Sequence, residues 1–175
     1  MAGQDFTPLE RDAWGGLVVT HGKLRRRLGA ALQEHHHLSH AEFEVLLLLS
    51  WAPERRLRLS DLAAKSMLTL SGMSRLVDRL EHAGLVTRTV ACEDRRGAYA
   101  ELTGEGLTRL CAAKTTDSAV IHQHFLALYD ARELAVMAGY WRRFLDRERA
   151  EAAPCEVAKP AGLVEAVAQT ALDHK

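Results

Sequence analysis

Apolar residues recur every three or four positions over much of the chain, which is the spacing that places them on one face of an amphipathic helix. The first such run predicts a long helix from Pro8 to about Glu34. Thr7 and Glu10 form a capping box before it, because each side chain can bond the backbone amide of the other residue. The apolar face comprises Trp14, Leu17, Val18, His21, Leu24, Leu28, Ala31 and Leu32. This helix therefore has an apolar face available for packing.

A second capping box, formed by Ser39 and Glu42, predicts a short and very apolar helix over residues 43–51. Pro53 follows and closes it, because proline cannot continue a helix. Residues 57–59 then alternate between apolar and basic, as a short strand does. We expect a buried helix followed by a strand.

Two short helices joined by a tight turn come next. Ser60 is the expected N-cap of a helix over residues 61–67, and a second helix covers about 69–83. Gly84 ends the second helix, since glycine tolerates the left-handed conformation that stops helices. At Met67, in the turn between the two, we expect no left-handed residue.

A β-hairpin is predicted after these helices. Residues 85–90 and 98–102 are rich in β-forming side chains and alternate in polarity, and the charged stretch 93–97 lies between them. The hairpin therefore has a charged tip.

Two further long helices are predicted, over about 103–129 and 131–150. Asp130 and Glu133 form the capping box of the second. Beyond it, apolar spacing over residues 163–172 predicts a short terminal helix. The pattern as a whole predicts a mainly α protein with a small β component.

The composition is that of an ordinary globular protein, with 47% apolar and 26% charged residues, and it argues against a disordered chain. Lys and Arg number 23 and so do Asp and Glu, so any patch for nucleic acid must be local. The three widely spaced cysteines fit reduced thiols. No secretory signal is visible, and the longest aliphatic run, Val45–Leu49, is far shorter than the roughly 18 residues of a membrane helix. We expect a cytoplasmic protein with no membrane partner.

The order helix, strand, helix, turn, helix, hairpin is that of a winged helix-turn-helix. On a helical wheel the helix over 69–83 places Leu70, Met73, Leu76, Val77, Leu80 and Ala83 on one face. Ser71, Arg75, Asp78 and His82 lie opposite, and Ser74 and Arg79 flank them. Small polar groups and arginines are the side chains that base edges and phosphates bind. Residues 55–100 hold nine basic against five acidic side chains, which gives this segment a net charge of +4.

Several motifs together resemble the MarR-type transcriptional regulators. They are Leu59-Ser60-Asp61-Leu62-Ala63, the run from Ser71 to Glu81, Gly84-Leu85-Val86-Thr87-Arg88, Asp94-Arg95-Arg96-Gly97 and Leu102-Thr103. The resemblance runs from about residue 38 to 107. It implies a homodimer paired through its outer helices, a recognition helix in each of two major grooves, and wing arginines at the minor groove.

The resemblance also implies the residues that would contact DNA, which are Ser71, Gly72, Ser74, Arg75, Arg79, Asp94 and Arg96. Ser71, Ser74 and Arg75 would contact bases or phosphates, with Arg79 nearer the backbone. Arg96 would be the arginine at the wing tip, oriented by Asp94. Gly72 either allows the helix to approach DNA closely or is a glycine without a function that the helix tolerates. The arginines and serines could also be ordinary solvated side chains, and Arg55, Arg56 and Arg58 fit a solvated turn better than a DNA contact.

Regulators of this kind often respond to small aromatic or phenolic acids. A pocket between the DNA lobe and the dimer helices would be lined by Trp14, His21, His37, Trp51 and His124, although each also suits an ordinary core or interface. The histidines at 35–37, 40, 122 and 124 fit a surface cluster better than a metal site, because neighbours at i and i+2 point to different faces of a helix. Cys92 lies beside Glu93, which disfavours the thiolate that a redox sensor needs.

No phosphate-binding glycine loop, HExxH helix, GxSxG motif or pair of catalytic carboxylates is present, so we expect no enzyme and no cofactor. The hypothesis is a homodimeric regulator, expected to be a repressor, that binds pseudo-palindromic double-stranded DNA with an affinity adjusted by a small ligand. Its parts would be a dimerisation helix over 1–36, a DNA-binding lobe over 37–103, dimerisation helices over 104–150 and an accessory tail over 151–175. The alternatives are a metal-responsive regulator of the same fold and a winged-helix protein-interaction module that does not bind DNA.

Overall fold

The computed structural model describes residues 5–90 and 98–152, which form six α-helices and a small antiparallel sheet. The helices are α1 (Pro8–His36), α2 (His40–Trp51), α3 (Leu59–Lys65), α4 (Leu70–His82), α5 (Gly104–His124) and α6 (Ala131–Ala152). The strands are β1 (Arg56–Arg58), β2 (Val86–Val90) and β3 (Ala98–Leu102), and two 3₁₀ turns, η1 (Pro53–Arg55) and η2 (Leu126–Leu128), complete the order. This architecture confirms the predicted mainly α fold with a winged helix-turn-helix.

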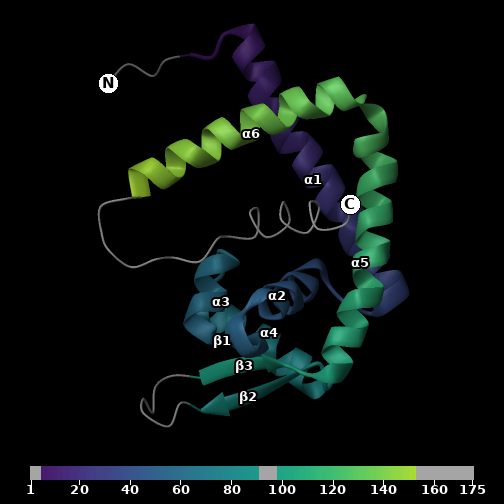
Figure 1. The fold of residues 1–175 in the computed structure, drawn as a ribbon, viewed down its shortest axis with the longest axis vertical. Coiled ribbons are helices and arrows are strands. Elements are labelled where there is room, and N and C mark those ends of the chain that lie inside the picture. The colour runs from purple at the N-terminus through teal and green to yellow at the C-terminus, as the bar shows by residue number, and fades with distance from the viewer. Residues whose placement is uncertain (1–4, 91–97, 153–175) are drawn as a thin grey trace.

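The long helices and the short elements occupy different parts of the molecule. Figure 1 shows α2, α3, α4 and the sheet gathered at one end, while α1, α5 and α6 extend away from them. Helix α1 packs along α5, whereas α6 packs extensively against no other element of the described chain. None of the helices within residues 5–90 and 98–152 is long and apolar enough to cross a membrane.

The sheet has the strand order β1-β3-β2, so the hairpin receives a third strand from before the two short helices. In this register Leu57 lies opposite Ala100, and Val86 lies opposite Leu102. Helix α2 is the centre of the core, because five consecutive residues from Val45 to Leu49 are each at most 6% exposed. The predicted burial of this helix is confirmed.

The predicted caps of the long helices are confirmed. Oγ1 of Thr7 accepts a hydrogen bond from the Glu10 amide at 3.3 Å, and the Glu10 carboxylate accepts one from the Thr7 amide at 2.8 Å. The Asp130 side chain and Glu133 exchange the equivalent bonds at the start of α6. Helix α1 continues to His36, slightly beyond the prediction, and ends where His37 adopts a left-handed conformation with φ 56°.

Two predicted helix boundaries are wrong. Helix α3 begins at Leu59 and not after Ser60, because β1 pairs with β3 up to Arg58 and the chain passes directly into the helix with Leu59 buried. Helix α5 ends at His124, well before residue 129, because Phe125 leaves the helical conformation and the 3₁₀ turn η2 follows.

The expectation for the turn between α3 and α4 is also wrong, because Met67 is left-handed, with φ 52°. The amide of Leu68 bonds the Ala63 carbonyl at 2.9 Å and that of Met67 bonds the Ala64 carbonyl at 3.4 Å. This is the Schellman pattern, in which the residue after the C-cap is left-handed. Helix α4 ends in the same pattern at Gly84, with φ 71°. The tight turn therefore imposes a conformation that the side chain of methionine does not favour.

Candidate nucleic-acid interface

Helix α4 has one face in the core and one in solvent. Met73, Leu76, Val77 and Leu80 are at most 3% exposed, as the helical wheel predicts. Ser71, Arg75 and Arg79 are exposed on the other side, and Ser74 is half-buried. Leu70 departs from the prediction, because it remains 58% exposed at the first position of the helix.

The start of α4 explains the glycine in its first turn. Oγ1 of Thr69, the N-cap, accepts a hydrogen bond from the Gly72 amide at 3.1 Å. A Cβ atom at position 72 would also lie 3.1 Å from that oxygen, which is a tight contact. Gly72 therefore fits the cap geometry, and a close approach to DNA at this residue stays a prediction.

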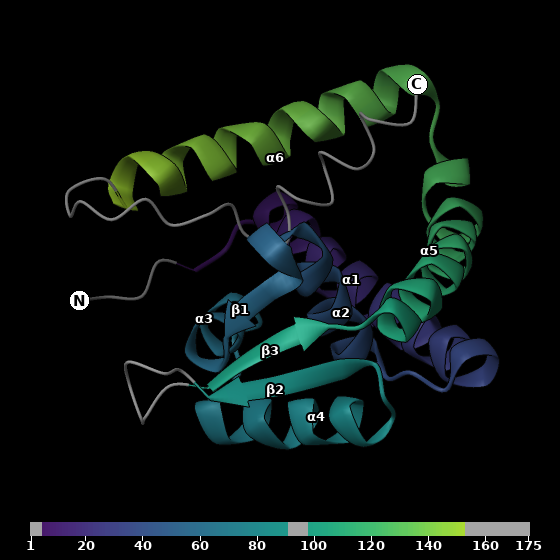
Figure 2. The ribbon, with the colours of Figure 1, turned by 60° about the horizontal axis from the view of Figure 1, so that its bottom comes forward.

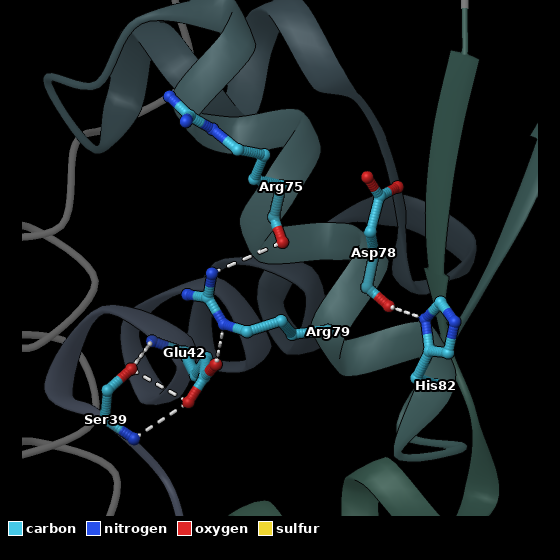
Figure 3. A network of polar contacts seen from close by, with 6 residues as sticks. All are labelled: Ser39, Glu42, Arg75, Asp78, Arg79 and His82. Atoms are coloured by element: carbon cyan, nitrogen blue, oxygen red, sulfur yellow. Dashed lines mark hydrogen bonds and ion pairs between the residues drawn. The ribbon is translucent and has the colours of Figure 1, made fainter.

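Arg75 and Arg79 differ in what surrounds them. Figure 3 shows the Arg75 side chain extending away from the polar network of α2 and α4, and its Nε donates to its own helix, to the Ser71 carbonyl at 3.4 Å. Arg79 points into that network: its Nε lies 2.9 Å from Oε1 of Glu42 on α2, and its Nη1 donates to the Arg75 carbonyl at 3.4 Å. Arg79 is therefore held within the network, whereas the guanidinium of Arg75 lies outside it.

Glu42 is both a helix cap and an ion-pair partner. Its Oε2 accepts bonds from the amide and the hydroxyl of Ser39, at 2.9 and 2.8 Å, while Oε1 binds Arg79. Burial raises the pKa of the Glu42 carboxyl, but the bonds from Ser39 and Arg79 outweigh burial and hold the pKa below its ordinary value. The carboxylate is therefore charged at neutral pH and fixes α2 against α4.

Sequence reasoning missed the role of Arg88. Its Nη1 lies 2.7 Å from Oδ1 of Asp78, its Nη2 donates to Oγ of Ser74 at 3.3 Å, and its amide donates to Oε1 of Glu81 at 3.1 Å. Strand β2 is thereby tied to the polar side of α4 (Figure 2). The sequence shows opposite charges at these positions, but no pattern in it pairs a strand residue with a helix residue ten positions earlier.

The aromatic ring of Tyr99 on β3 holds two arginines of β1. The guanidinium carbons of Arg56 and Arg58 lie 4.2 and 5.3 Å from the ring centroid, and Nε of Arg58 donates to the Tyr99 hydroxyl at 2.8 Å. The interpretation as a solvated turn suits Arg55, which is exposed, but is wrong for Arg56, which is half-buried on the ring.

Two of the predicted contacts, Asp94 and Arg96, lie outside the described residues, as does the predicted helix over 163–172.

The residues predicted to line a ligand pocket lie on separate elements. Trp14 and His21 on α1 and His37 after it are exposed, whereas Trp51 on α2 and His124 on α5 are half-buried. An open hollow of about 490 Å³ does exist, but it is lined by Ser50, Ala52, Glu54, Arg55, Glu101 and Leu102. The pocket stays a prediction.

The histidines near the junction of α1 and α2 have local partners. Nε2 of His36 lies 2.7 Å from Oγ1 of Thr116, and Nε2 of His40 lies 3.4 Å from Oε1 of Glu44. Burial, with His35 and Arg109 nearby, lowers the pKa of His36. Among the residues that the structure describes, no group of three or more His, Cys, Asp and Glu is arranged to hold a metal ion.

Comparison with known proteins gives consistent results. Residues 38–97 match the model of the MarR family. The chain is 40% identical over 73 residues to the HTH-type transcriptional repressor YetL of Bacillus subtilis, an alignment that covers 42% of this chain and 44% of the repressor. It is 35% identical over 82 residues to the HTH-type transcriptional regulator PapX of Escherichia coli, covering 45% and 50% of the two chains. The matches thus span about half the length of these curated relatives.

Solved structures match over most of their length. AbsC, a MarR family transcriptional regulator from Streptomyces coelicolor, is 29% identical with a TM-score of 0.73, covering 85% of this chain and 99% of that one. Sco3205, from the same organism and solved in complex with DNA, is 26% identical with a TM-score of 0.75, covering 89% and 96%. The curated relatives are described as transcriptional regulators, which agrees with the prediction that this chain is no enzyme.

Proposed function

Since the chain belongs to the MarR family, we propose that it is a transcriptional regulator that binds specific sequences of double-stranded DNA as a homodimer. The observation that carries the proposal is the exposed face of α4, where Ser71 and Arg75 stand at the start of a helix whose other face is fixed in the core. A major groove about 12 Å wide admits one helix, and the N-terminal residues of a recognition helix contact the base edges. Rigid support and a free polar face are what such a helix needs.

The charge of the lobe supports the same role. Residues 55–100 have a net charge of +4 in a chain whose total is zero, so the basic side chains are concentrated where α4 and the hairpin lie. Phosphate contacts by such residues supply much of the affinity of proteins for DNA. Arg88 holds β2 beside α4, so the hairpin would reach the duplex next to the groove that α4 occupies.

The dimer is proposed from the surface of α6. Tyr140, Trp141, Phe144 and Val136 are between 43% and 61% exposed on one helix that packs extensively against nothing else in the described chain. At the beginning of α1, Trp14 is 58% exposed. Large exposed apolar surfaces mark protein interfaces, and a self-complementary one gives a two-fold dimer. A second copy of the chain would cover these faces.

A dimer would place two α4 helices about one turn of DNA apart, roughly 34 Å, and would therefore bind a pseudo-palindrome. A small ligand could favour one of two angles between the DNA-binding lobes. It would then change the affinity for DNA by at most the factor by which the ligand itself binds one arrangement more tightly than the other. We further propose that a small ligand regulates the protein in this way, and that the protein acts in the cytoplasm as a repressor.

The test is selection of bound duplexes from a random-sequence pool at near-physiological salt, because it assumes no operator. We expect a pseudo-palindrome with half-sites about one helical turn apart. Light scattering on the same protein should give a mass of twice the 19.4 kDa of one chain. A folded dimer that enriches no sequence would overturn the proposed DNA recognition, and a monomer would overturn the proposed interface.

Two arginine variants locate the site. Arg75→Ala should lower both affinity and sequence preference, whereas Arg96→Ala should weaken binding mainly at the minor groove and reduce its dependence on salt. Arg27→Ala, an exposed arginine on α1, is the matched control and should leave sequence preference unchanged. If Arg75→Ala binds the selected site as the unmodified protein does, Arg75 is not part of the interface. Addition of small aromatic acids to the complex then tests the proposed regulation.

A further inference from the structure

An apolar side chain at the N-terminal end of α4 lies outside the core. Leu70 is the first residue of the helix and is 58% exposed, although its neighbours on the same wheel face, such as Met73, are fully buried. Met67 and Leu68, in the preceding turn, are 92% and 39% exposed. The fold therefore does not account for the leucine at this position.

Its place on the helix connects Leu70 with the polar residues of the proposed interface. With about 100° of rotation per residue, Leu70, Ser74, Ser71 and Arg75 follow one another around about 140° of the circumference of α4. Leu70 thus lies at one edge of this face of α4, and Arg75 lies at the opposite edge. Because the N-terminal turn of a recognition helix lies deepest among the base edges, Leu70 would enter the groove together with Ser71.

The major groove offers one apolar group to such a side chain. Adenine, guanine and cytosine present hydrogen-bond donors and acceptors there, whereas thymine adds its C5-methyl group, which apolar side chains contact. We propose that Leu70 packs against a thymine methyl and thereby specifies thymine at one position of each half-site. The proposal rests on the proposed function, since it requires α4 to lie in the major groove.

The experiment replaces thymine by deoxyuridine, which removes the methyl group and keeps the pairing edge. Each thymine of the selected operator is replaced in turn, and the Kd is measured for the full-length protein and for Leu70→Ala. For the unmodified protein, one symmetry-related pair of replacements should weaken binding by about fourfold for each methyl buried. For Leu70→Ala the same replacements should have no effect, and a new selection should show no preference for thymine at that position.

Two further variants keep the outcome clear. Leu70→Met retains an apolar side chain and should retain the dependence on thymine, while Met67→Ala should retain it as well because the turn precedes the helix. Far-ultraviolet circular dichroism and thermal melting verify that Leu70→Ala is folded.

The proposal is overturned if no deoxyuridine replacement weakens binding, or if Leu70→Ala keeps the same dependence on the thymine methyl. A change in oligomeric mass on Leu70→Ala, with the dependence unchanged, would assign Leu70 to an interface between copies instead. Failure of the proposed function is distinct, because no operator would then be selected.

Discussion

The guanidinium of Arg88 on β2 lies 2.7 Å from the carboxylate of Asp78 on α4, and this ion pair joins the hairpin to the helix proposed to enter the groove. The two side chains are 32% and 45% exposed, so solvent screens their attraction in part. The pair therefore orients the two elements relative to each other more than it stabilises the fold.

A double-mutant cycle measures that contribution. Asp78→Asn, Arg88→Gln and the double variant should give a coupling energy of at most about 1 kcal/mol by urea unfolding at low salt, falling as salt rises. The helical pair Arg109 and Glu105, at 3.5 Å and more exposed on the acidic side, is the matched control and should couple more weakly. A coupling that does not change with salt would contradict the electrostatic account.

The Glu42 carboxyl should make stability depend on pH. Its pKa is lower in the folded protein than its ordinary value of 4.5, so the ionised form stabilises the fold above that pH. This stabilisation is lost as the pH falls through the lowered pKa of the folded state. Glu42→Gln should therefore lower the free energy of unfolding by about 1 kcal/mol at pH 7, and the difference should vanish in acid.

Gly106 should tolerate no side chain. A Cβ atom there would overlap the carbonyl oxygen of Leu85 and lie 2.8 Å from Cδ1 of Leu102. Gly106→Ala should cost about 3 kcal/mol in urea unfolding, because α5 would have to move away from the sheet. Gly104→Ala is the matched control: nothing lies within 4 Å of its Cβ position, so we expect a gain of about 0.4 to 1 kcal/mol. Equal effects of the two substitutions would refute the close approach of α5.

Met67 should be replaceable by glycine with a gain in stability. Its φ of 52° disfavours any side chain, and because Met67 is 92% exposed its removal loses little packing. Relief of the left-handed strain, about 1 to 2 kcal/mol, exceeds the entropic cost of glycine, about 0.5 to 1 kcal/mol. Met67→Gly should therefore raise the melting temperature, whereas Met67→Ala, which keeps the strain, should not. Identical melting of both variants would show that the turn carries no strain.

Part of the candidate interface was predictable from residue spacing. The wheel of α4 placed Ser71, Arg75 and Arg79 on the solvent side, and the structure has them exposed. It could not show that Arg79 bonds Glu42, because the two residues lie 37 positions apart and meet only when α2 and α4 pack. Nor could it show that Leu70 stays exposed, because the first residue of the helix projects beyond the core that receives Met73.

The sequence by itself determined where the capped helices α1 and α6 start and which face of α4 is buried. Capping boxes such as Thr7 with Glu10, and the stop at Gly84, act between residues within one turn, so local chemistry specifies them. Tertiary structure decided what depends on distant partners: β1 joins the sheet through β3, and this pairing moves the start of α3. Short-range bonds are encoded by spacing along the chain, whereas ion pairs such as that of Arg88 and Asp78 exist only once packing has brought the two elements together.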